Sequence, residues 1–246
     1  MSPELVVIPP PQTVAGAAIA GLPRAIRLAI AQHGACNLVL AGGTTPRAAY
    51  EGLVGQPIDW SKVHVWFGDE RCVPPDHEAS NFKMANDALL TKVAIPADQV
   101  HRIRGELPAT DAAAEYDAHV AGVRFDIVLL GMGNDGHTAS LFPGSDALES
   151  DALVVPTESP FPPLERVSMT LRAINSARFV VVLAAGLAKA PALADVFAER
   201  ASGRPRLPAA RVQPTHGELT WIVDPPAAAL LPVNTDDPPA DESAVT

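Results

Sequence analysis

Short apolar segments recur along the chain, and most lead through a polar or glycine-containing loop into an amphipathic segment of about ten residues or more. Apolar runs of this kind are typical of strands buried on both faces of a sheet. Because parallel strands need a crossover connection, usually a helix, the alternation predicts an α/β fold with a doubly wound, mostly parallel sheet and helices on both faces. The expected strands are 5–8, 37–40, 63–67, 125–130, 179–183 and 219–223, and the expected helices are 13–32, a segment starting near Pro46, 82–90, 111–120 and 189–200.

The chain has 246 residues without an internal repeat or a linker, which predicts a single domain over residues 1–231. Within it, Val167–Leu171 alternates between apolar and polar side chains, as a half-exposed strand would. Residues 232–246 have no basic side chain, and their prolines discourage regular structure, so we expect an acidic, disordered tail. Its acidic residues are Asp236, Asp237, Asp241 and Glu242.

The chain carries 18 Lys and Arg residues against 28 Asp and Glu residues, a formal net charge of −10. This excess of negative charge argues against nucleic acid and anionic membranes as partners and favours a small molecule. Without the four acidic residues of the tail the charge is still −6. An anionic substrate therefore requires a local cluster of Arg and Lys at its site.

The sequence also indicates the cellular compartment and the redox state of the cysteines. No uninterrupted apolar run reaches about 18 residues, and the start Met1–Glu4 lacks the basic region and apolar core of a secretory signal, so we expect a cytoplasmic protein without membrane contact. The two cysteines, Cys36 and Cys72, have no metal-binding spacing and are expected to be reduced thiols. The sequence does not determine the oligomeric state, and a monomer is favoured.

A glycine-rich loop, Gly131–Gly144, follows the apolar run at 125–130 and carries a histidine. Ligand crevices of open α/β sheets form at the carboxyl ends of strands, so we expect His137 to face a ligand and to act as a base on water. Asp135 either orients that imidazole or makes a local Asx-turn. The loop also matches the G-x-G-x-x-G pattern of dinucleotide sites, but we reject that interpretation because it runs into Phe142-Pro143-Gly144 and opens no long helix.

A second loop has the composition of a phosphate site. Gly42 and Gly43 let the backbone approach an anion, and Thr44 and Thr45 add hydroxyl groups. The helix expected to follow them offers unpaired N–H groups and the positive end of its dipole. The alternative is an ordinary N-capped turn between a strand and a helix.

Two cations also follow expected strands, namely Arg71 and Lys189. Both could reach the crevice, where a charge-assisted contact to a phosphate contributes roughly 1.5–3 kcal/mol. Taken singly, either is more typical of a solvated surface charge. Asp69 and Glu70 precede Arg71, and they either cap the next element or pair with that arginine.

Metal and nucleophile chemistry have little support in the sequence. Asp69, Asp135 and His137 could imitate a mixed metal site, but no pair has His-x-x-x-His or Cys-x-x-Cys spacing, so we predict no required metal. No serine lies in a G-x-S-x-G elbow, which disfavours nucleophilic catalysis. The other histidines are expected on the surface or on helix faces: His33, His64, His77, His101, His119 and His216.

Five segments together resemble the 6-phosphogluconolactonase family, and they occur in that family's order. They are Leu40–Pro46, Trp66–Pro74, Ser80–Phe82, Asn134–Pro143 and Arg166–Thr170, and the likeness runs from about Leu5 to Leu231. The resemblance implies hydrolysis of 6-phospho-D-glucono-1,5-lactone to 6-phospho-D-gluconate in the oxidative pentose phosphate pathway, without a cofactor.

The resemblance also implies roles for individual residues. Gly43, Thr44, Thr45, Arg71 and Lys189 would hold the phosphate, with Arg166 as a helper, and His137 would be the base. The complete candidate site comprises a catalytic group of His137, Asp135 and Asp69, and a substrate-binding group of Gly42, Gly43, Thr44, Thr45, Arg71, Asn134, Arg166 and Lys189.

Two other functions, an isomerase and a sugar-phosphate sensor, have less support in the sequence. Glucosamine-6-phosphate deaminases are similar, but their pattern has a glutamate shortly after the histidine, where this chain reads Thr138–Pro143 without a carboxylate. That difference disfavours aldose–ketose isomerisation. A non-catalytic sugar-phosphate sensor would need an output module, and no helix-turn-helix-like segment or basic patch precedes the domain.

Overall fold

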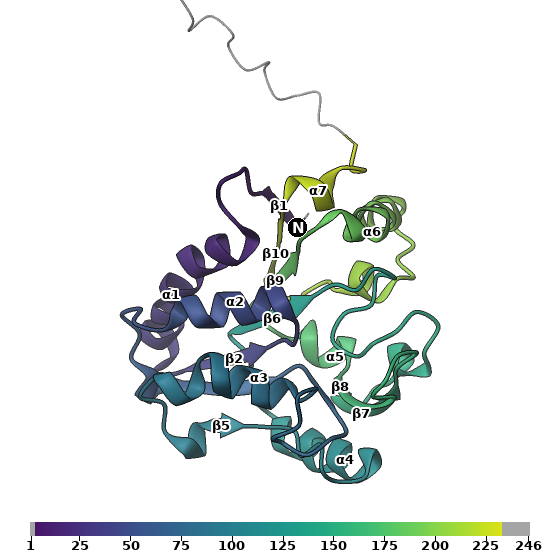
Figure 1. Cartoon of the computed structure of the whole chain (residues 1–246). Helices are drawn as coiled ribbons and strands as arrows, with labels where there is room; N and C mark the ends of the chain where they lie inside the picture. The colour runs from purple at the N-terminus through teal and green to yellow at the C-terminus, as the bar shows by residue number, and fades with distance from the viewer. Residues whose placement is uncertain (1–2, 233–246) are drawn as a thin grey trace, which may run out of the picture.

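The computed structural model describes residues 3–232, which form a seven-stranded sheet beside a three-stranded one (Figure 1). The strand order of the large sheet is β1-β10-β9-β6-β2-β3-β5, and all neighbouring strands are parallel. These strands are β1 (Glu4–Val7), β2 (Cys36–Leu40), β3 (Val63–Phe67), β5 (Val100–His101), β6 (Ile127–Gly131), β9 (Phe179–Ala184) and β10 (Glu218–Val223). The predicted doubly wound parallel sheet is confirmed.

The helices are α1 (Val14–His33), α2 (Thr44–Leu53), α3 (Asn81–Ala88), α4 (Ala109–Val120), α5 (Leu171–Ile174), α6 (Ala190–Ser202) and α7 (Pro225–Ala228). Side chains cap two of the longer ones. The Thr13 hydroxyl accepts a hydrogen bond from the backbone N–H of Gly16 at the start of α1, and the Ser80 hydroxyl accepts one from Lys83 at the start of α3. Each cap satisfies a backbone donor that the helix itself leaves unpaired.

Helices cover both faces of the large sheet, as two adjacent residues of β3 show. The Trp66 ring lies 6.2 Å from the ring of Tyr116 and 5.3 Å from that of His119, both on α4. The Phe67 ring lies 6.0 Å from the ring of Phe82 on α3. Because successive strand residues point to opposite faces, α3 and α4 lie on opposite sides of the sheet.

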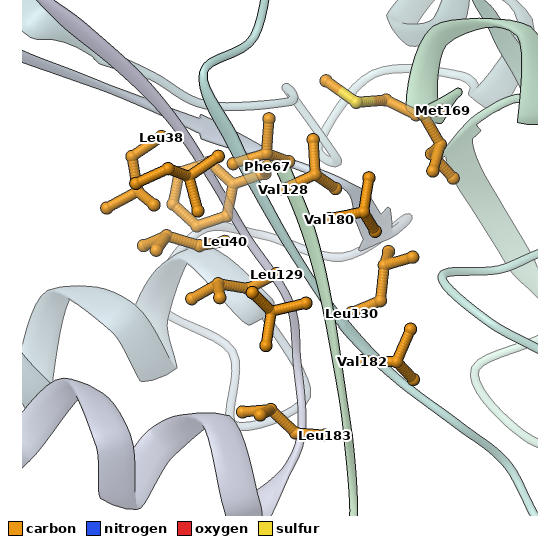
Figure 2. Close-up of a cluster of buried hydrophobic side chains, with 14 of the residues drawn as sticks. Leu38, Leu40, Phe67, Val128, Leu129, Leu130, Met169, Val180, Val182 and Leu183 are labelled. Carbon is orange, nitrogen blue, oxygen red and sulfur yellow. The ribbon is translucent and has the colours of Figure 1, made fainter. Parts of the chain in front are cut away.

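The core is centred on the middle strands, which are apolar on both faces. Figure 2 shows part of this cluster of buried side chains: Leu38, Leu40, Phe67, Val128, Leu129, Leu130, Met169, Val180, Val182 and Leu183. Burial of one such side chain stabilises the folded state by roughly 1.5–3 kcal/mol. These strands therefore provide a rigid base for the loops that leave their carboxyl ends.

The second sheet is antiparallel, in the order β4-β8-β7, and comprises β4 (Asp69–Arg71), β7 (Val154–Glu158) and β8 (Glu165–Met169). The sequence pattern predicted a half-exposed strand at Val167–Leu171, and this was wrong in two respects. Val167, Ser168 and Met169 are all buried, because α4 packs on this sheet, and Leu171 already begins α5. Strands β4 and β7 were not expected.

Helix α1 is long and apolar enough to cross a membrane by length and composition alone. In the structure its apolar face, which includes Leu22 and Ile26, is buried and packs on β2, β9 and β10. The buried core helix of a soluble protein can meet the same criteria of length and composition. The expectation of no membrane contact therefore stays a prediction. The predicted acidic tail, 232–246, lies outside the described residues except for Pro232.

Two histidines depart from their expected places. His64 and His101 lie on β3 and β5, not on a helix face, and both are partly buried. The His101 ring stacks on Trp66 with a centroid distance of 3.9 Å, and its Nε2 lies 3.0 Å from His64 Nδ1. Aromatic stacking at the end of the sheet thus overrides the preference of histidine for the surface.

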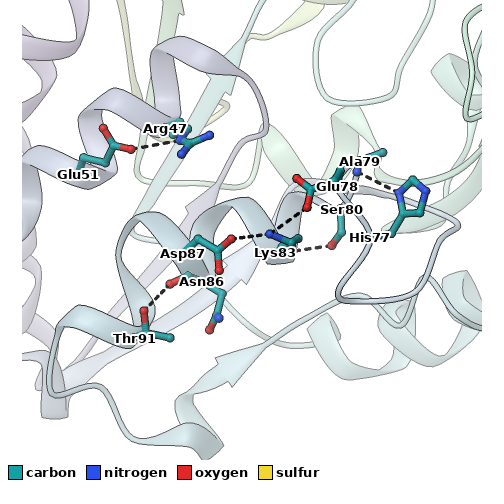
Figure 3. Close-up of polar contacts among 10 residues, drawn as sticks. All are labelled: Arg47, Glu51, His77, Glu78, Ala79, Ser80, Lys83, Asn86, Asp87 and Thr91. Atoms are coloured by element: carbon teal, nitrogen blue, oxygen red, sulfur yellow. Dashed lines mark hydrogen bonds and ion pairs between the residues drawn. The ribbon is translucent and has the colours of Figure 1, made fainter.

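Ion pairs on α2 and α3 lie along the helix surface (Figure 3). Arg47 pairs with Glu51, and Lys83 pairs with Asp87 and with Glu78. The first two pairs are four residues apart, where side chains on a helix meet, and each adds only a few tenths of a kcal/mol, about 0.2–0.5. These charges support the helices without belonging to the cleft described below.

Candidate active site

The site lies where the strand order reverses. From β2 the chain proceeds outward to β3 and β5, whereas from β6 it proceeds in the other direction to β9 and β10. Loops that leave neighbouring strands at such a switch point diverge to opposite faces and open a crevice between them. Here the loops after β2 and β6 border one cleft with a volume of about 270 Å³.

Sixteen residues from both sheets line this cleft. They are Ala41, Gly42, Gly43, Asp69, Arg71, Asn81, Gly131, Met132, Gly133, His137, Ala139, Phe142, Ser159, Phe161, Arg166 and Lys189. The parallel sheet contributes the glycine loops, and the small antiparallel sheet contributes both arginines. Segments far apart in sequence therefore converge on one surface.

The loop after β2 leads directly into α2, whose N-cap is Gly43 at φ = 107°. Glycine tolerates this left-handed backbone, and no side chain among the described residues caps the helix. Gly42 is needed for a different reason, because a Cβ there would lie 2.2 Å from Oδ1 of Asn81. The first N–H groups of α2 thus remain available to an anion.

The imidazole of His137 is paired with a carboxylate. Its Nδ1 lies 2.6 Å from Oδ1 of Asp135, which also accepts a hydrogen bond from the backbone N–H of His137. A Cβ on Gly133 would lie 2.1 Å from Nδ1, so the glycine leaves room for the ring. Phe142 supports the ring at a centroid distance of 4.7 Å.

This pairing perturbs the carboxylate. Partial burial alone would raise the pKa of Asp135, but the hydrogen bonds from His137 and the positive charge that its ring can carry lower that pKa below its usual value. Asp135 is therefore a carboxylate that accepts hydrogen bonds from both the backbone and the ring of His137. Both predicted roles fit this geometry, because Asp135 contacts the ring of His137 and also accepts from the backbone N–H two residues on, as in an Asx-turn.

Two arginines lie side by side on neighbouring strands of the antiparallel sheet, because Arg71 on β4 is the register partner of Arg166 on β8. Arg71 donates to the backbone oxygen of Ala79 at 2.6 Å. Arg166 is buried, and its Nε donates to the backbone oxygen of Pro163 at 2.7 Å. Burial, followed by the nearby charge of Arg71, lowers the pKa of Arg166.

Lys189 completes the positive wall from the segment after β9. Its ammonium has no hydrogen bond or ion pair with another described residue. Burial lowers the pKa of Lys189, and the negative charge of Asp135 opposes that shift. Arg71, Arg166 and Lys189 together form the local cationic cluster that the overall charge of the chain requires for an anionic substrate.

The two adjacent carboxylates Asp69 and Glu70 have different surroundings. Glu70 accepts hydrogen bonds from the backbone N–H groups of Asn81 and Phe82 and from the Ser80 hydroxyl, so it caps α3 and does not face the cleft. Burial raises the pKa of Glu70, and these hydrogen bonds oppose that shift. The capping alternative is confirmed for Glu70.

Asp69 does line the cleft. Its Oδ2 accepts a hydrogen bond from the Ser140 hydroxyl at 2.6 Å, and its Oδ1 accepts one from the side-chain amide of Asn81 at 3.1 Å. All three side chains are buried. Asp69 therefore links the loop after β6 to the start of α3.

Most of the predicted site residues meet in the cleft, and four do not line it. Gly42, Gly43, Asp69, Arg71, His137, Arg166 and Lys189 line it. The side chains of Thr44, Thr45 and Asn134 do not, and Asp135 lies behind His137. Thr44 and Thr45 are the first residues of α2, so any contact they make with a ligand would be through the backbone N–H groups at this end of the helix.

The sequence reasoning missed several lining residues, notably Asn81, Ser159 and Phe161. The sequence indicates a motif at Ser80–Phe82 but does not indicate that it belongs to the site. Hydrogen bonds to the carboxylates of Asp69 and Glu70 on β4 hold this segment beside the cleft. Ser159 and Phe161 carried no signal, because the hairpin between β7 and β8 was not expected. Within residues 3–232 no three His, Cys, Asp or Glu side chains are grouped as metal ligands, and the expected lack of a metal stays a prediction.

Known proteins share both the sequence pattern and the fold. The 6-phosphogluconolactonase of Nostoc sp. is 41% identical over 220 residues, which cover 83% of this chain and 88% of that protein. The 6-phosphogluconolactonase of Synechocystis sp. is 39% identical over 246 residues, covering 94% and 99%. The solved structure of 6-phosphogluconolactonase from Trypanosoma brucei has a TM-score of 0.82 at 29% identity and covers 94% of this chain and 99% of its own.

A family model described as glucosamine-6-phosphate isomerases/6-phosphogluconolactonase matches residues 9–221. This range contains every predicted site residue and all of the cleft. The resemblance noted in the sequence is thereby confirmed at the level of the family. The chain belongs to the glucosamine-6-phosphate isomerase/6-phosphogluconolactonase family.

Proposed function

We propose that the chain hydrolyses 6-phospho-D-glucono-1,5-lactone to 6-phospho-D-gluconate. The observation that carries this proposal is the arrangement of the cleft, in which a cationic wall and an imidazole–carboxylate pair border the same cavity. The names of the relatives support the same activity. A lactone that carries a phosphate at its far end needs both features at once.

The phosphate end of the substrate is assigned to the cationic wall. Arg71 and Lys189 supply charge, Arg166 assists them, and the open N–H groups at the start of α2 supply backbone donors. Gly42 and Gly43 let the anion approach those donors closely. Thr44 and Thr45 contribute their N–H groups in this assignment, and Asn134 stays a predicted contact at the rim.

The lactone end is assigned to His137. When Nδ1 carries the hydrogen and donates a hydrogen bond to Asp135, the neutral imidazole is the tautomer whose Nε2 holds a lone pair. Nε2 removes a proton from water as the water oxygen attacks the lactone carbonyl carbon, and the carbonyl oxygen becomes an oxyanion. The bond to the ring oxygen then breaks, and the imidazolium returns the proton to that oxygen.

Asp69 is assigned to the wall between these two ends. Its carboxylate accepts hydrogen bonds from Ser140 and Asn81, and it still borders the cleft. In this proposal it accepts a further hydrogen bond from a hydroxyl of the sugar and keeps Asn81 in place. The isomerase alternative has less support, because no glutamate follows His137 within Thr138–Pro143.

The proposed reaction uses no metal, cofactor or second macromolecule, and these absences stay predictions, as does a monomeric state. The expected cytoplasmic location also stays a prediction, since the relatives include plant proteins described as chloroplastic. A sugar-phosphate sensor would bind 6-phosphogluconate without turning over the lactone.

Acid release from freshly made 6-phosphogluconolactone tests the proposal. The rate with the protein is compared with spontaneous hydrolysis, and unphosphorylated gluconolactone serves as the control substrate. We expect turnover far above the spontaneous rate for the phosphorylated lactone and a much lower kcat/KM for the control. Equal rates on both lactones would contradict the assignment of the cationic wall to the phosphate. A lack of turnover of both lactones would contradict the proposed activity.

A further inference from the structure

The hairpin between β7 and β8 presents an aromatic side chain at the cleft. Phe161 lines the cleft and is 65% exposed, whereas the other phenylalanine of the cleft, Phe142, is 7% exposed. A phenyl ring left open to water beside a polar cavity has apolar surface that a ligand can cover. Packing within the described residues therefore leaves most of Phe161 uncovered beside the cleft.

The backbone around Phe161 is held by side chains. The Ser159 hydroxyl accepts a hydrogen bond from the N–H of Phe161, and Nη2 of Arg166 donates to the carbonyl oxygen of Phe161. Arg166 also holds the next turn through the carbonyl oxygen of Pro163. Because these bonds fix the hairpin in the free protein, a ligand that meets the ring loses little affinity to ordering the loop.

The other functional groups of the cleft are polar. Arg71 and Lys189 carry positive charge, and His137 and Asp69 offer hydrogen-bonding groups. A sugar lactone also has an apolar side, since the C–H groups of a six-membered ring give it a face without hydroxyl hydrogens. An aromatic ring at the rim of a polar cavity is suited to cover that face.

We propose that Phe161 packs against the C–H face of the sugar ring and thereby selects ring-shaped sugar phosphates over smaller phosphates. This inference rests on the proposed function of the cleft and adds a residue that determines specificity. Arg166 acts as a positioning residue in this account, because it holds the backbone that carries the ring. Phe161 contacts the substrate but takes no part in proton transfer.

The test uses Phe161→Ala and two companion variants. Phe161→Tyr keeps an aromatic ring, and Leu164→Ala removes an apolar side chain from the same hairpin that is 48% exposed but does not line the cleft. Steady-state hydrolysis of 6-phosphogluconolactone is measured with glucose 6-phosphate and inorganic phosphate as competitors. Glucose 6-phosphate has a six-membered ring, and inorganic phosphate has none.

We expect Phe161→Ala to raise the KM for the lactone and the Ki for glucose 6-phosphate about five- to tenfold, the size of an aromatic stacking contribution, with kcat within about twofold. The Ki for inorganic phosphate should not change. Phe161→Tyr and Leu164→Ala should match the unmodified protein. This pattern separates a contact with the sugar from a general disturbance of the phosphate site.

An unchanged KM in Phe161→Ala would overturn the inference, and so would an equal rise in the Ki of both competitors. If the unmodified protein fails to hydrolyse the lactone, the proposed function fails on its own. Calorimetric binding of glucose 6-phosphate and inorganic phosphate to the same variants then decides the role of Phe161. A loss of affinity confined to glucose 6-phosphate supports it, and equal affinities overturn it.

Discussion

The contact between His137 and Asp135 determines which imidazole nitrogen can serve as a base. Asp135 lies 2.6 Å from Nδ1, and a carboxylate can only accept the hydrogen there. Nε2 is then the nitrogen left with a lone pair. A single pair of residues in a glycine-rich loop thus sets both the orientation of the ring and its tautomer.

Replacement of His137 by asparagine should remove the base and leave the cationic wall intact. General-base assistance is worth about 10²- to 10⁴-fold, so we expect kcat to fall by that factor while the affinity for 6-phosphogluconate persists. Turnover of 6-phosphogluconolactone and calorimetric binding of the product provide the two measurements. His216→Asn, at an exposed histidine, is the control and should keep full activity. Near-full turnover by His137→Asn at neutral pH would exclude the assigned role.

Replacement of Lys189 by methionine should weaken substrate binding. One charge-assisted hydrogen bond to phosphate contributes roughly 1.5–3 kcal/mol, which corresponds to a rise in KM of about 10- to 150-fold. The kcat/KM for unphosphorylated gluconolactone should not fall with it. Lys92→Met removes an exposed lysine and should behave as the unmodified protein. Equal losses on both lactones would show that Lys189 does not contact the phosphate.

At the scale of elements, β4 couples the site to the stability of the fold. Its three residues, Asp69, Glu70 and Arg71, are charged, and each has a different task. Asp69 and Arg71 border the cleft, whereas Glu70 lies on the other side and caps α3. The strand thereby connects the cleft to the start of α3.

Replacement of Glu70 by glutamine should destabilise the domain. The new amide nitrogen is a donor, and it would face the backbone N–H of Phe82 or, in the flipped orientation, those of Arg71 and Asn81, which need an acceptor. We expect the free energy of unfolding to fall by about 1–3 kcal/mol in urea titrations. Glu78→Gln, whose side chain is 90% exposed, should change it by less than about 0.5 kcal/mol. Equal effects of the two variants would contradict the capping role.

Sequence reasoning succeeded for elements whose burial follows from their own residues. The apolar runs that became β2, β6 and β9 are hydrophobic on both faces, so they indicate interior parallel strands without further context. β4 could not be found in this way, because three consecutive charged residues are typical of a loop. Their burial is stabilised by hydrogen bonds to residues 10 to 71 positions away, which no local pattern contains.

The same distinction holds for the site. Residues that lie directly after interior strands, such as Gly43 and His137, were predicted because their position follows from the topology. Asn81 and Phe161 line the same cleft only because α3 and the β7–β8 hairpin fold back over it. Their place depends on tertiary packing, and the sequence gives no periodicity that would reveal it.

For the whole molecule, a net charge of −10 contrasts with the cluster of Arg71, Arg166 and Lys189 at the cleft. A local positive wall in an otherwise negative protein concentrates the potential where an anion has to bind. Most of the acidic excess lies elsewhere on the chain. The distribution of charge, not its total, therefore agrees with a phosphorylated substrate.

The stability of the whole domain should depend on pH through His101. Burial, followed by the nearby charges of His119 and His64, lowers the pKa of His101 from 6.5 to about 4. The unfolded chain then binds more protons between these values, so the free energy of unfolding should be highest above pH 6.5 and fall as the pH decreases toward 4. His101 is partly exposed, so we expect a loss on the order of 1 kcal/mol.

Urea titrations at several pH values measure this dependence. His101→Phe keeps an aromatic ring against Trp66 and should reduce the slope between pH 6.5 and 4. His216→Asn is the control and should keep the slope of the unmodified protein. An unchanged slope in His101→Phe would contradict the assignment to His101.

We expect one cleft to hold the phosphate at one end and to present the reacting carbon to His137 at the other. A crystal structure of the protein with 6-phosphogluconate tests this most directly. We predict the phosphate against Arg71, Lys189 and the start of α2, with the carboxylate carbon of the product about 4 Å or less from His137 Nε2. A phosphate bound elsewhere, or a carboxylate directed away from the imidazole, would contradict the account.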